Sequence, residues 1–135
     1  MQTFIAAFSI FCANCVGGEW YKLHRAVASM EYVLPSRCFA NSMRGQGVSE
    51  HWINALATAK RPIDVEFYFA NDRVVGWTNP DSDNLIRLNR KFHDGFGICM
   101  QASNLAHEVL HLEGFRHFVD AAYATNQAFA GCCRD

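Results

Sequence analysis

The sequence predicts a single α+β domain, and three observations lead to this fold class. The chain has 135 residues, 50% of them apolar, which suits one hydrophobic core and leaves little room for a second domain. Apolar residues recur at helical spacing in the first part of the chain and again after residue 100, whereas the segment between them alternates as strands do. Helices, then strands, then another helix are the order expected of an α+β domain.

The first 18 residues carry no charge, and the run 4–11 is strongly apolar. This run is too short to cross a bilayer as a helix. Two interpretations remain open: a secretory signal cleaved near Cys15, and an apolar element buried in the domain. The absence of Lys or Arg before the run weakens the first, and Cys12 with Cys15 also has the spacing of a redox pair. The single domain is expected over 19–135.

Two helices are predicted in the first half of the chain. In 19–30 the apolar residues recur at intervals of three or four, as they do on one face of a helix. A second helix is expected over 49–60, because Ser49 is a typical N-cap residue and the apolar side chains after it, including Trp52, fall on one face.

A short sheet of three or more strands is predicted next, followed by a helix. Residues 63–70 (IDVEFYFA) alternate and are rich in β-forming residues, and 73–78 and 84–89 (NLIRLN) form two further runs separated by polar turns. A last helix is expected over 101–113, after a loop marked by Gly97.

Four of the six cysteines are predicted to form two disulfides. Cys38 and Cys99 are far from each other and from the adjacent Cys132 and Cys133, and they lack the paired spacing of a structural zinc site. Adjacent cysteines rarely bond each other, so each should reach a different partner. Cys38 therefore pairs with one member of the adjacent pair and Cys99 with the other, and both choices stay open. This usage is typical of a secreted or extracytoplasmic protein.

The charge balance gives no support for a nucleic-acid partner. Twelve basic and thirteen acidic residues leave a formal net charge of −1, and the chain contains no run of Lys or Arg. Binding to a phosphate backbone depends on such clusters. We therefore expect no nucleic-acid partner, and no segment long enough for a transmembrane helix.

The run HEVLHLEGFRH, at 107–117, contains the residues that point to chemistry. His107 and His111 lie one helical turn apart, so both imidazoles leave the same side of the predicted helix and can reach one cation. Gly114 stands where the helix should stop, and a left-handed residue there turns the chain. That turn allows His117 to swing back as third ligand. Three neutral imidazoles leave a fourth position for water, which is the arrangement of a catalytic zinc site.

This run resembles the long zinc-binding signature of the metzincin metallopeptidases, H-E-x-x-H-x-x-G-x-x-H. The resemblance implies a small zincin-like domain with one catalytic Zn²⁺ and a minimal C-terminal part. It implies a zinc-dependent endopeptidase that hydrolyses peptide or protein substrates with a metal-activated water, for which Glu108 is the general base. It also implies that the strand nearest the metal, here 84–89, pairs with extended substrate.

One part of the metzincin pattern is missing. The family places a methionine-containing turn below the metal, well after the third histidine, and no methionine follows His117 in this chain. Tyr123 is the one candidate to replace that turn or to steady an oxyanion through its hydroxyl group. The alternative for Tyr123 is an aromatic residue packed under the helix.

Two other functions remain open. The run is similar to the H-G-x-L-H-L-x-G-x-D-H motif of small bacterial zinc endoribonucleases, although Glu108 replaces that family's glycine and Arg116 its aspartate. A zinc-stabilised binding module without catalysis is the second alternative, and the presence of Glu108 argues against it. A peptidase class with a distant glutamate as third ligand is excluded, because no glutamate follows Glu113.

The histidines outside the run, His24, His51 and His93, are expected on helix faces or in loops. Of these, His93 is the candidate for contact with substrate. Glu113 and Asp120 each have two interpretations, a carboxylate that orients a ligand histidine and a solvated surface group.

Overall fold

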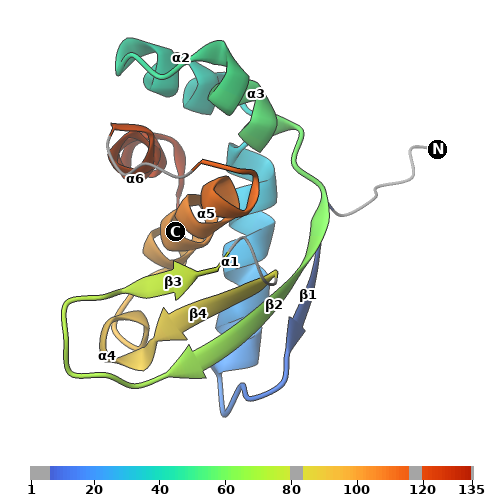
Figure 1. Cartoon of the computed structure of the whole chain (residues 1–135), viewed down its shortest axis with the longest axis vertical. Helices are drawn as coiled ribbons and strands as arrows, with labels where there is room; N and C mark the ends of the chain where they lie inside the picture. Colours follow the sequence, from blue (N-terminus) through green and yellow to red (C-terminus); the bar gives the residue numbers. More distant parts are fainter. Residues whose placement is uncertain (1–6, 80–83, 116–119, 135) are drawn as a thin grey trace.

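The computed structural model describes residues 7–79, 84–115 and 120–134, which form a four-stranded mixed sheet and six helices (Figure 1). The strands are β1 (Phe8–Cys12), β2 (Arg61–Tyr68), β3 (Gly76–Thr78) and β4 (Leu85–Asn89). The helices are α1 (Glu19–Val33), α2 (Arg37–Gly45), α3 (Glu50–Ala57), α4 (Arg90–His93), α5 (Ile98–Leu112) and α6 (Asp120–Cys132). The predicted α+β class is confirmed.

The sheet has the order β1-β2-β4-β3, in which β1, β2 and β4 are parallel and β3 is antiparallel. Strand β4 therefore lies inside the sheet, and the expectation that 84–89 pairs with substrate is wrong. The chain turns back after β2 and lays β3 along the outer side of β4, so β3 forms that edge. Gly76 allows this pairing, since a Cβ atom there would lie 2.7 Å from the carbonyl oxygen of Arg87.

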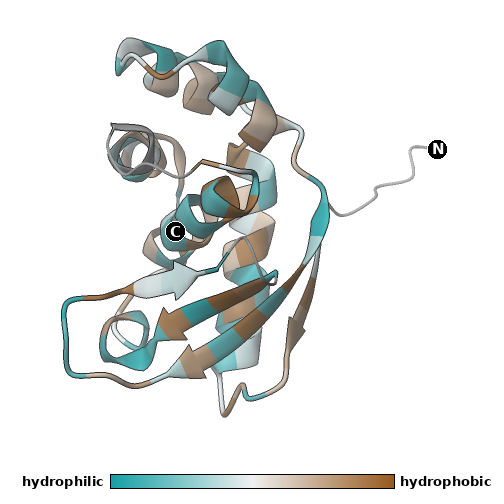
Figure 2. Ribbon diagram, viewed as in Figure 1, coloured by the Kyte–Doolittle hydropathy of each residue, from teal (hydrophilic) through white to brown (hydrophobic). Residues whose placement is uncertain are grey.

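Helices cover one face of the sheet, and no helix in the described part of the chain covers the other. Along β2, Ile63, Val65 and Phe67 are buried while the residues between them are exposed. Figure 2 shows this alternation as bands of opposite hydropathy along the strand. Helix α1 lies behind the sheet in Figure 1 and packs along α5, and the core between them is continuous with the buried side of β2.

Four elements were not predicted from the sequence. Helices α2, α4 and α6 and strand β1 occupy segments that the periodicity left unassigned. Helix α2 begins at a recognisable cap, because the Ser36 hydroxyl accepts a hydrogen bond from the backbone N–H of Phe39 at 3.1 Å. Strand β1 contains the second half of the apolar N-terminal run, which is therefore part of the sheet. The side chain of Asn14 extends that pairing by bonding the N–H and the C=O of Phe67.

Three disulfides involve all six cysteines. The prediction that Cys38 and Cys99 pair with the adjacent cysteines is confirmed, and the choice is Cys38 with Cys132 and Cys99 with Cys133. The two bonds tie the end of α6 to α2 and to α5. Among the described helices none combines the length and apolar composition that crossing a membrane requires.

The buried side chain of Asn89 organises the connection between β2 and β3. Its amide group donates to the carbonyls of Ala70 and Val74, each at 2.9 Å. Its carbonyl oxygen accepts from the backbone N–H groups of Ala70 and Lys91, each at 3.1 Å. Asn89 is fully buried, so these backbone groups depend on it in place of water.

We expect Asn89→Ala to lower the free energy of unfolding by about 3 kcal/mol, because several buried polar groups lose their partner at once. Urea denaturation of the wild type and the variant measures the difference. Asn54→Ala, at an exposed position of α3, is the matched control and should change stability by less than about 0.5 kcal/mol. Equal effects of the two substitutions would contradict this role.

His93 closes α4 and is only 1% exposed, so the prediction that it contacts substrate is wrong. Its ring packs edge-on against Phe67 and Phe96, and its Nδ1 lies 3.4 Å from the side-chain nitrogen of Gln101. Burial lowers the pKa of His93 from 6.5 to about 4, and the charge of Lys22 acts in the same direction.

The fold should lose stability in acid because of His93. The pKa is lower in the folded state than in the unfolded state, so the unfolded chain takes up the proton first. The contribution of His93 is therefore complete above pH 6.5 and is lost as the pH falls towards 4. At pH 5 the loss is about 2 kcal/mol. Urea titrations at about pH 7.5 and pH 5 should show a smaller fall for His93→Leu than for the wild type, and an equal fall would refute the assignment.

Candidate functional site

Helix α5 presents His107 and His111 on the side that the core does not cover. Leu105, Val109 and Leu110 are fully buried, and the helix packs against α1, α6, α3 and β3. Both histidines are half-buried. Because residues four apart share a helix face, the two rings leave α5 in the same direction, as the sequence predicted.

The two imidazoles approach each other through their Nε2 atoms. These atoms lie 3.2 Å apart, and the ring centroids are separated by 4.9 Å. Two ligands of a tetrahedral zinc ion, each about 2.0–2.1 Å from the metal, lie about 3.3 Å apart. The pair therefore has the spacing of adjacent zinc ligands, and imidazole nitrogen is a donor that suits this metal.

The second ring nitrogen of His111 is held by the chain that follows the helix. Its Nδ1 lies 2.7 Å from the carbonyl oxygen of Phe115. A carbonyl only accepts, so Nδ1 carries the hydrogen and the neutral ring has its lone pair on Nε2. That nitrogen faces His107. Ligand histidines usually have such a partner on the nitrogen that does not bind the metal.

Helix α5 ends in a Schellman motif centred on Gly114, whose φ of 111° lies in the left-handed region. The N–H of Phe115 donates to the carbonyl of Leu110 at 3.2 Å, and the N–H of Gly114 donates to that of His111 at 3.0 Å. The prediction that Gly114 stops the helix and turns the chain is confirmed. The Phe115 carbonyl, which follows this turn, lies beside the His111 ring.

Glu108, next to His107, is almost completely buried. Burial raises the pKa of its carboxyl group to about 7. Tyr68, at the end of β2, belongs to the same surroundings: burial raises the pKa of its phenol, and the charges of Asp72 and Glu108 act in the same direction. Tyr68 could not be identified from the sequence, because the alternation along β2 predicts only which face of the sheet its side chain is on.

The predicted third ligand, His117, lies outside the described residues, which stop at Phe115 and resume at Asp120. Within the described segments no group of three or more His, Cys, Asp or Glu side chains is arranged to hold a metal. Of the predicted zinc ligands and base, the structure describes His107, His111 and Glu108.

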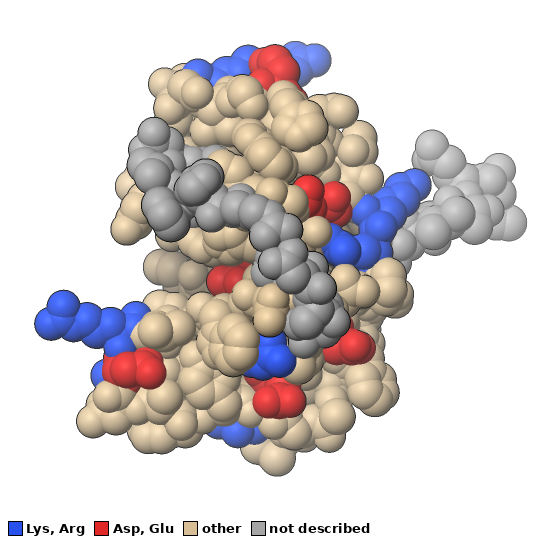
Figure 3. Space-filling model, in the orientation of Figure 1, with Lys and Arg blue, Asp and Glu red and all other residues tan. Residues whose placement is uncertain are grey.

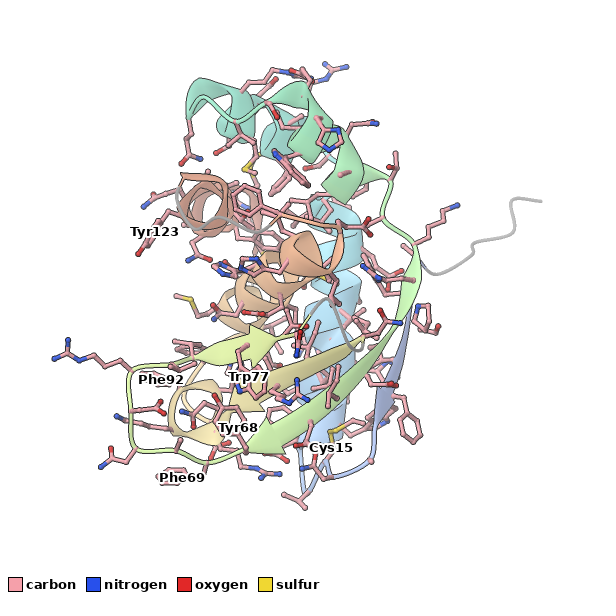
Figure 4. The ribbon with its side chains drawn as sticks, in the orientation of Figure 1. Cys15, Tyr68, Phe69, Trp77, Phe92 and Tyr123 are labelled. Carbon is pink, nitrogen blue, oxygen red and sulfur yellow. A yellow bond between two sulfur atoms is a disulfide. The ribbon has the colours of Figure 1, made fainter. Side chains whose placement is uncertain are left out.

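Tyr123, the predicted oxyanion residue, is 73% exposed. Its side chain projects outwards from α6 (Figure 4), so the alternative in which it packs under the helix is wrong. The same view shows Trp77 on β3, the edge strand that contacts α5.

The remaining polar candidates have other surroundings. Glu113 forms an ion pair with Arg61 at 3.5 Å, which ties the end of α5 to the start of β2. His24 and His51 are exposed and lie against neighbouring tryptophans on their own helices. The side chain of Asp120 is outside the described part of the structure.

A cavity of about 320 Å³ lies between α5 and α6. Met100, Ser103, Asn126 and Phe129 line it together with the disulfide from Cys99. Ser103 lies one turn before His107 on α5, so the cavity adjoins the stripe that carries the histidines.

Comparisons with known proteins did not identify a relative. A scan against protein-family models gave no match, and neither did comparisons with curated proteins and with solved structures.

A residue with a side chain should be strained at position 114, because Gly114 has a φ of 111°. No neighbouring atom lies within 4 Å of a Cβ built there, so Gly114→Ala isolates the backbone strain. We expect it to lower the free energy of unfolding by roughly 1–2 kcal/mol. Gly45→Ala, at the end of α2 in equally open space, is the control and should leave stability unchanged or raise it slightly. Urea unfolding measures both, and a neutral Gly114→Ala would overturn the argument.

Proposed function

We propose that this protein is a zinc-dependent endopeptidase in which His107, His111 and His117 bind one Zn²⁺ and Glu108 is the general base. The observation that carries the proposal is the histidine pair on α5. Its Nε2 atoms are 3.2 Å apart, and one ring is held in the tautomer that a ligand requires. His117 enters from the sequence motif alone, three residues after the helix-ending glycine.

The order of the elements supports the finer assignment to a zincin-like fold. A parallel sheet with one antiparallel edge strand precedes the helix that carries the motif, and that edge strand, β3, contacts the helix. No described strand pairs with the outer side of β3. An extended peptide can add to such an edge through backbone hydrogen bonds. We therefore assign to β3 the substrate-pairing role expected of 84–89.

A zinc ion in this site would lower the pKa of a water molecule and polarise the carbonyl group of a peptide. Glu108 is adjacent to the first ligand and buried, so it can take the proton of the attacking water and deliver it to the leaving nitrogen. The carbonyl of Phe115 keeps the Nε2 lone pair of His111 available. The cavity beside Ser103 offers space for an apolar side chain of the substrate.

The surroundings of the site agree better with a peptide substrate than with RNA. On the face drawn in Figure 3, acidic and basic side chains are interspersed, and no continuous basic surface of the kind that binds a phosphate backbone is visible there. Three disulfides favour an extracytoplasmic location for the proposed peptidase.

The test compares metal content and cleavage of an unfolded protein such as reduced casein. The wild type should contain one zinc per chain and should cleave the substrate until a chelator is added. Glu108→Gln should keep the zinc and lose roughly 10²–10⁴-fold in turnover, because the base is gone while the ligands remain. His107→Ala should lose the zinc as well.

Glu50→Gln, at an exposed surface ion pair on α3, is the control and should retain full activity. A wild type that binds zinc but cleaves no protein would refute the peptidase, and structured RNA would then be the substrate to try. A wild type without affinity for zinc would refute the metal site itself.

A further inference from the structure

Trp52 of α3 packs against the residue that holds His111. The rings of Trp52 and Phe115 meet edge to face, with centroids 5.2 Å apart and an interplanar angle of 83°. Both side chains are partly buried against the core. In Figure 1, α3 lies above α5, and the two helices are in contact. Helix α3, although distant in the sequence, therefore reaches the end of the helix that carries the motif.

Phe115 has three groups, and each makes a different contact. Its N–H donates to Leu110, within the turn that ends α5. Its carbonyl accepts from His111 Nδ1 at 2.7 Å. Its ring contacts two other rings, that of Trp52 with a centroid distance of 5.2 Å and that of His111 with a centroid distance of 6.1 Å. The contact with Trp52 connects Phe115 to another helix, α3.

The turn alone does not fix the direction of the Phe115 carbonyl. Gly114, which precedes it, has the widest range of backbone angles of any residue, so small rotations at the glycine swing the following peptide groups. An anchor on the Phe115 side chain removes this freedom. An edge-to-face contact between large rings provides such an anchor, because it is directional and buries much apolar surface.

We propose that Trp52 is a positioning residue: by holding the Phe115 ring, it keeps the Phe115 carbonyl on His111 Nδ1 and so presents His111 Nε2 to the metal. This inference rests on the proposed zinc site. Trp52 would act on the metal through two contacts, from its ring to Phe115 and from the Phe115 carbonyl to His111. A residue that only fills the core would have no effect on zinc affinity.

The experiment separates positioning from packing by measuring zinc affinity apart from stability. Trp52→Leu, Trp52→Phe and Trp20→Leu are prepared in the full chain, and zinc is titrated in competition with a chromogenic chelator at a temperature where circular dichroism shows each variant folded. The visible absorption of bound Co²⁺ reports the ligand geometry. Trp20 is the matched control, because it is a partly exposed tryptophan on α1 whose ring contacts His24.

We expect Trp52→Leu to weaken zinc binding by roughly tenfold and to alter the Co²⁺ spectrum, since loss of a partner that orients a ligand has effects of this size. Trp52→Phe, which keeps an aromatic edge, should stay within about threefold of the wild type. Trp20→Leu should bind both metals as the wild type does.

A second variant keeps the test decisive where Trp52→Leu does not fold. Phe115→Leu retains the carbonyl and removes the ring that contacts both Trp52 and His111, so it should weaken zinc binding at least as much as Trp52→Leu does. In the double variant the loss should be smaller than the sum of the two single losses, because both substitutions break the Trp52–Phe115 contact.

Wild-type affinity and an unchanged Co²⁺ spectrum in Trp52→Leu or Phe115→Leu, with only the unfolding midpoint lowered, would overturn the inference and leave the zinc site standing. Failure of the wild type itself to bind either metal would instead remove the proposed function.

Discussion

The hydrogen bond between His111 and the Phe115 carbonyl connects the end of the motif helix, a candidate metal ligand and the packing of α3. It belongs to the turn that ends α5, it sets the tautomer of a candidate ligand, and it depends on a residue whose ring packs on another helix. In the proposed zinc site this bond would hold the His111 ring in the orientation and tautomer that present its Nε2 to the metal, beside His107. The turn requires Gly114, and the orientation of the helix requires the buried residues of α5. The contact between His111 and Phe115 therefore depends on the sequence, on the local structure and on the packing of the helix.

The rest of the fold holds this helix end in place from several sides. Arg61 at the start of β2 forms an ion pair with Glu113, which lies between the motif helix and Gly114. The Cys99–Cys133 disulfide fastens the first turn of α5 to the end of α6, and Cys38–Cys132 fastens α6 to α2. A small domain has limited apolar surface to bury, and covalent ties of long range compensate for this most effectively. The two bonds therefore add to the packing of α6 against α2 and α5.

The sequence was informative wherever a local rule and the tertiary structure agree. The spacing of His107 and His111 and the stop at Gly114 could be predicted, because each follows from helix geometry. The chemistry of adjacent cysteines predicted that Cys38 and Cys99 pair with Cys132 and Cys133, but it left both orders open. The positions of elements relative to distant parts of the chain could not be predicted. Nothing local distinguishes β4 as an inner strand from β3 as an edge, and nothing in the sequence shows that Asn89 is buried among backbone groups. The sequence predicts His93 on a helix face or in a loop, as a candidate for contact with substrate, whereas aromatic neighbours from β2 and the following loop enclose it. Trp52 appeared only as an apolar helix residue, and its contact with Phe115 is visible only once α3 is placed.

The adjacency of Cys132 and Cys133 has a consequence for how the chain matures. In an unfolded chain the two thiols are equivalent competitors for Cys38 and Cys99, because exchanging them changes each loop by a single residue. Cys132 is the last residue of α6, and Cys133 follows it with its N–H still bonded to the Phe129 carbonyl at 2.9 Å. With α6 formed, the first thiol reaches Cys38 of α2 and the second reaches Cys99 of α5. The position of the end of α6 thus determines which of the two thiols reaches which partner. Docking of this helix therefore favours the observed pairing over the exchanged one, because it brings each sulfur atom to one partner.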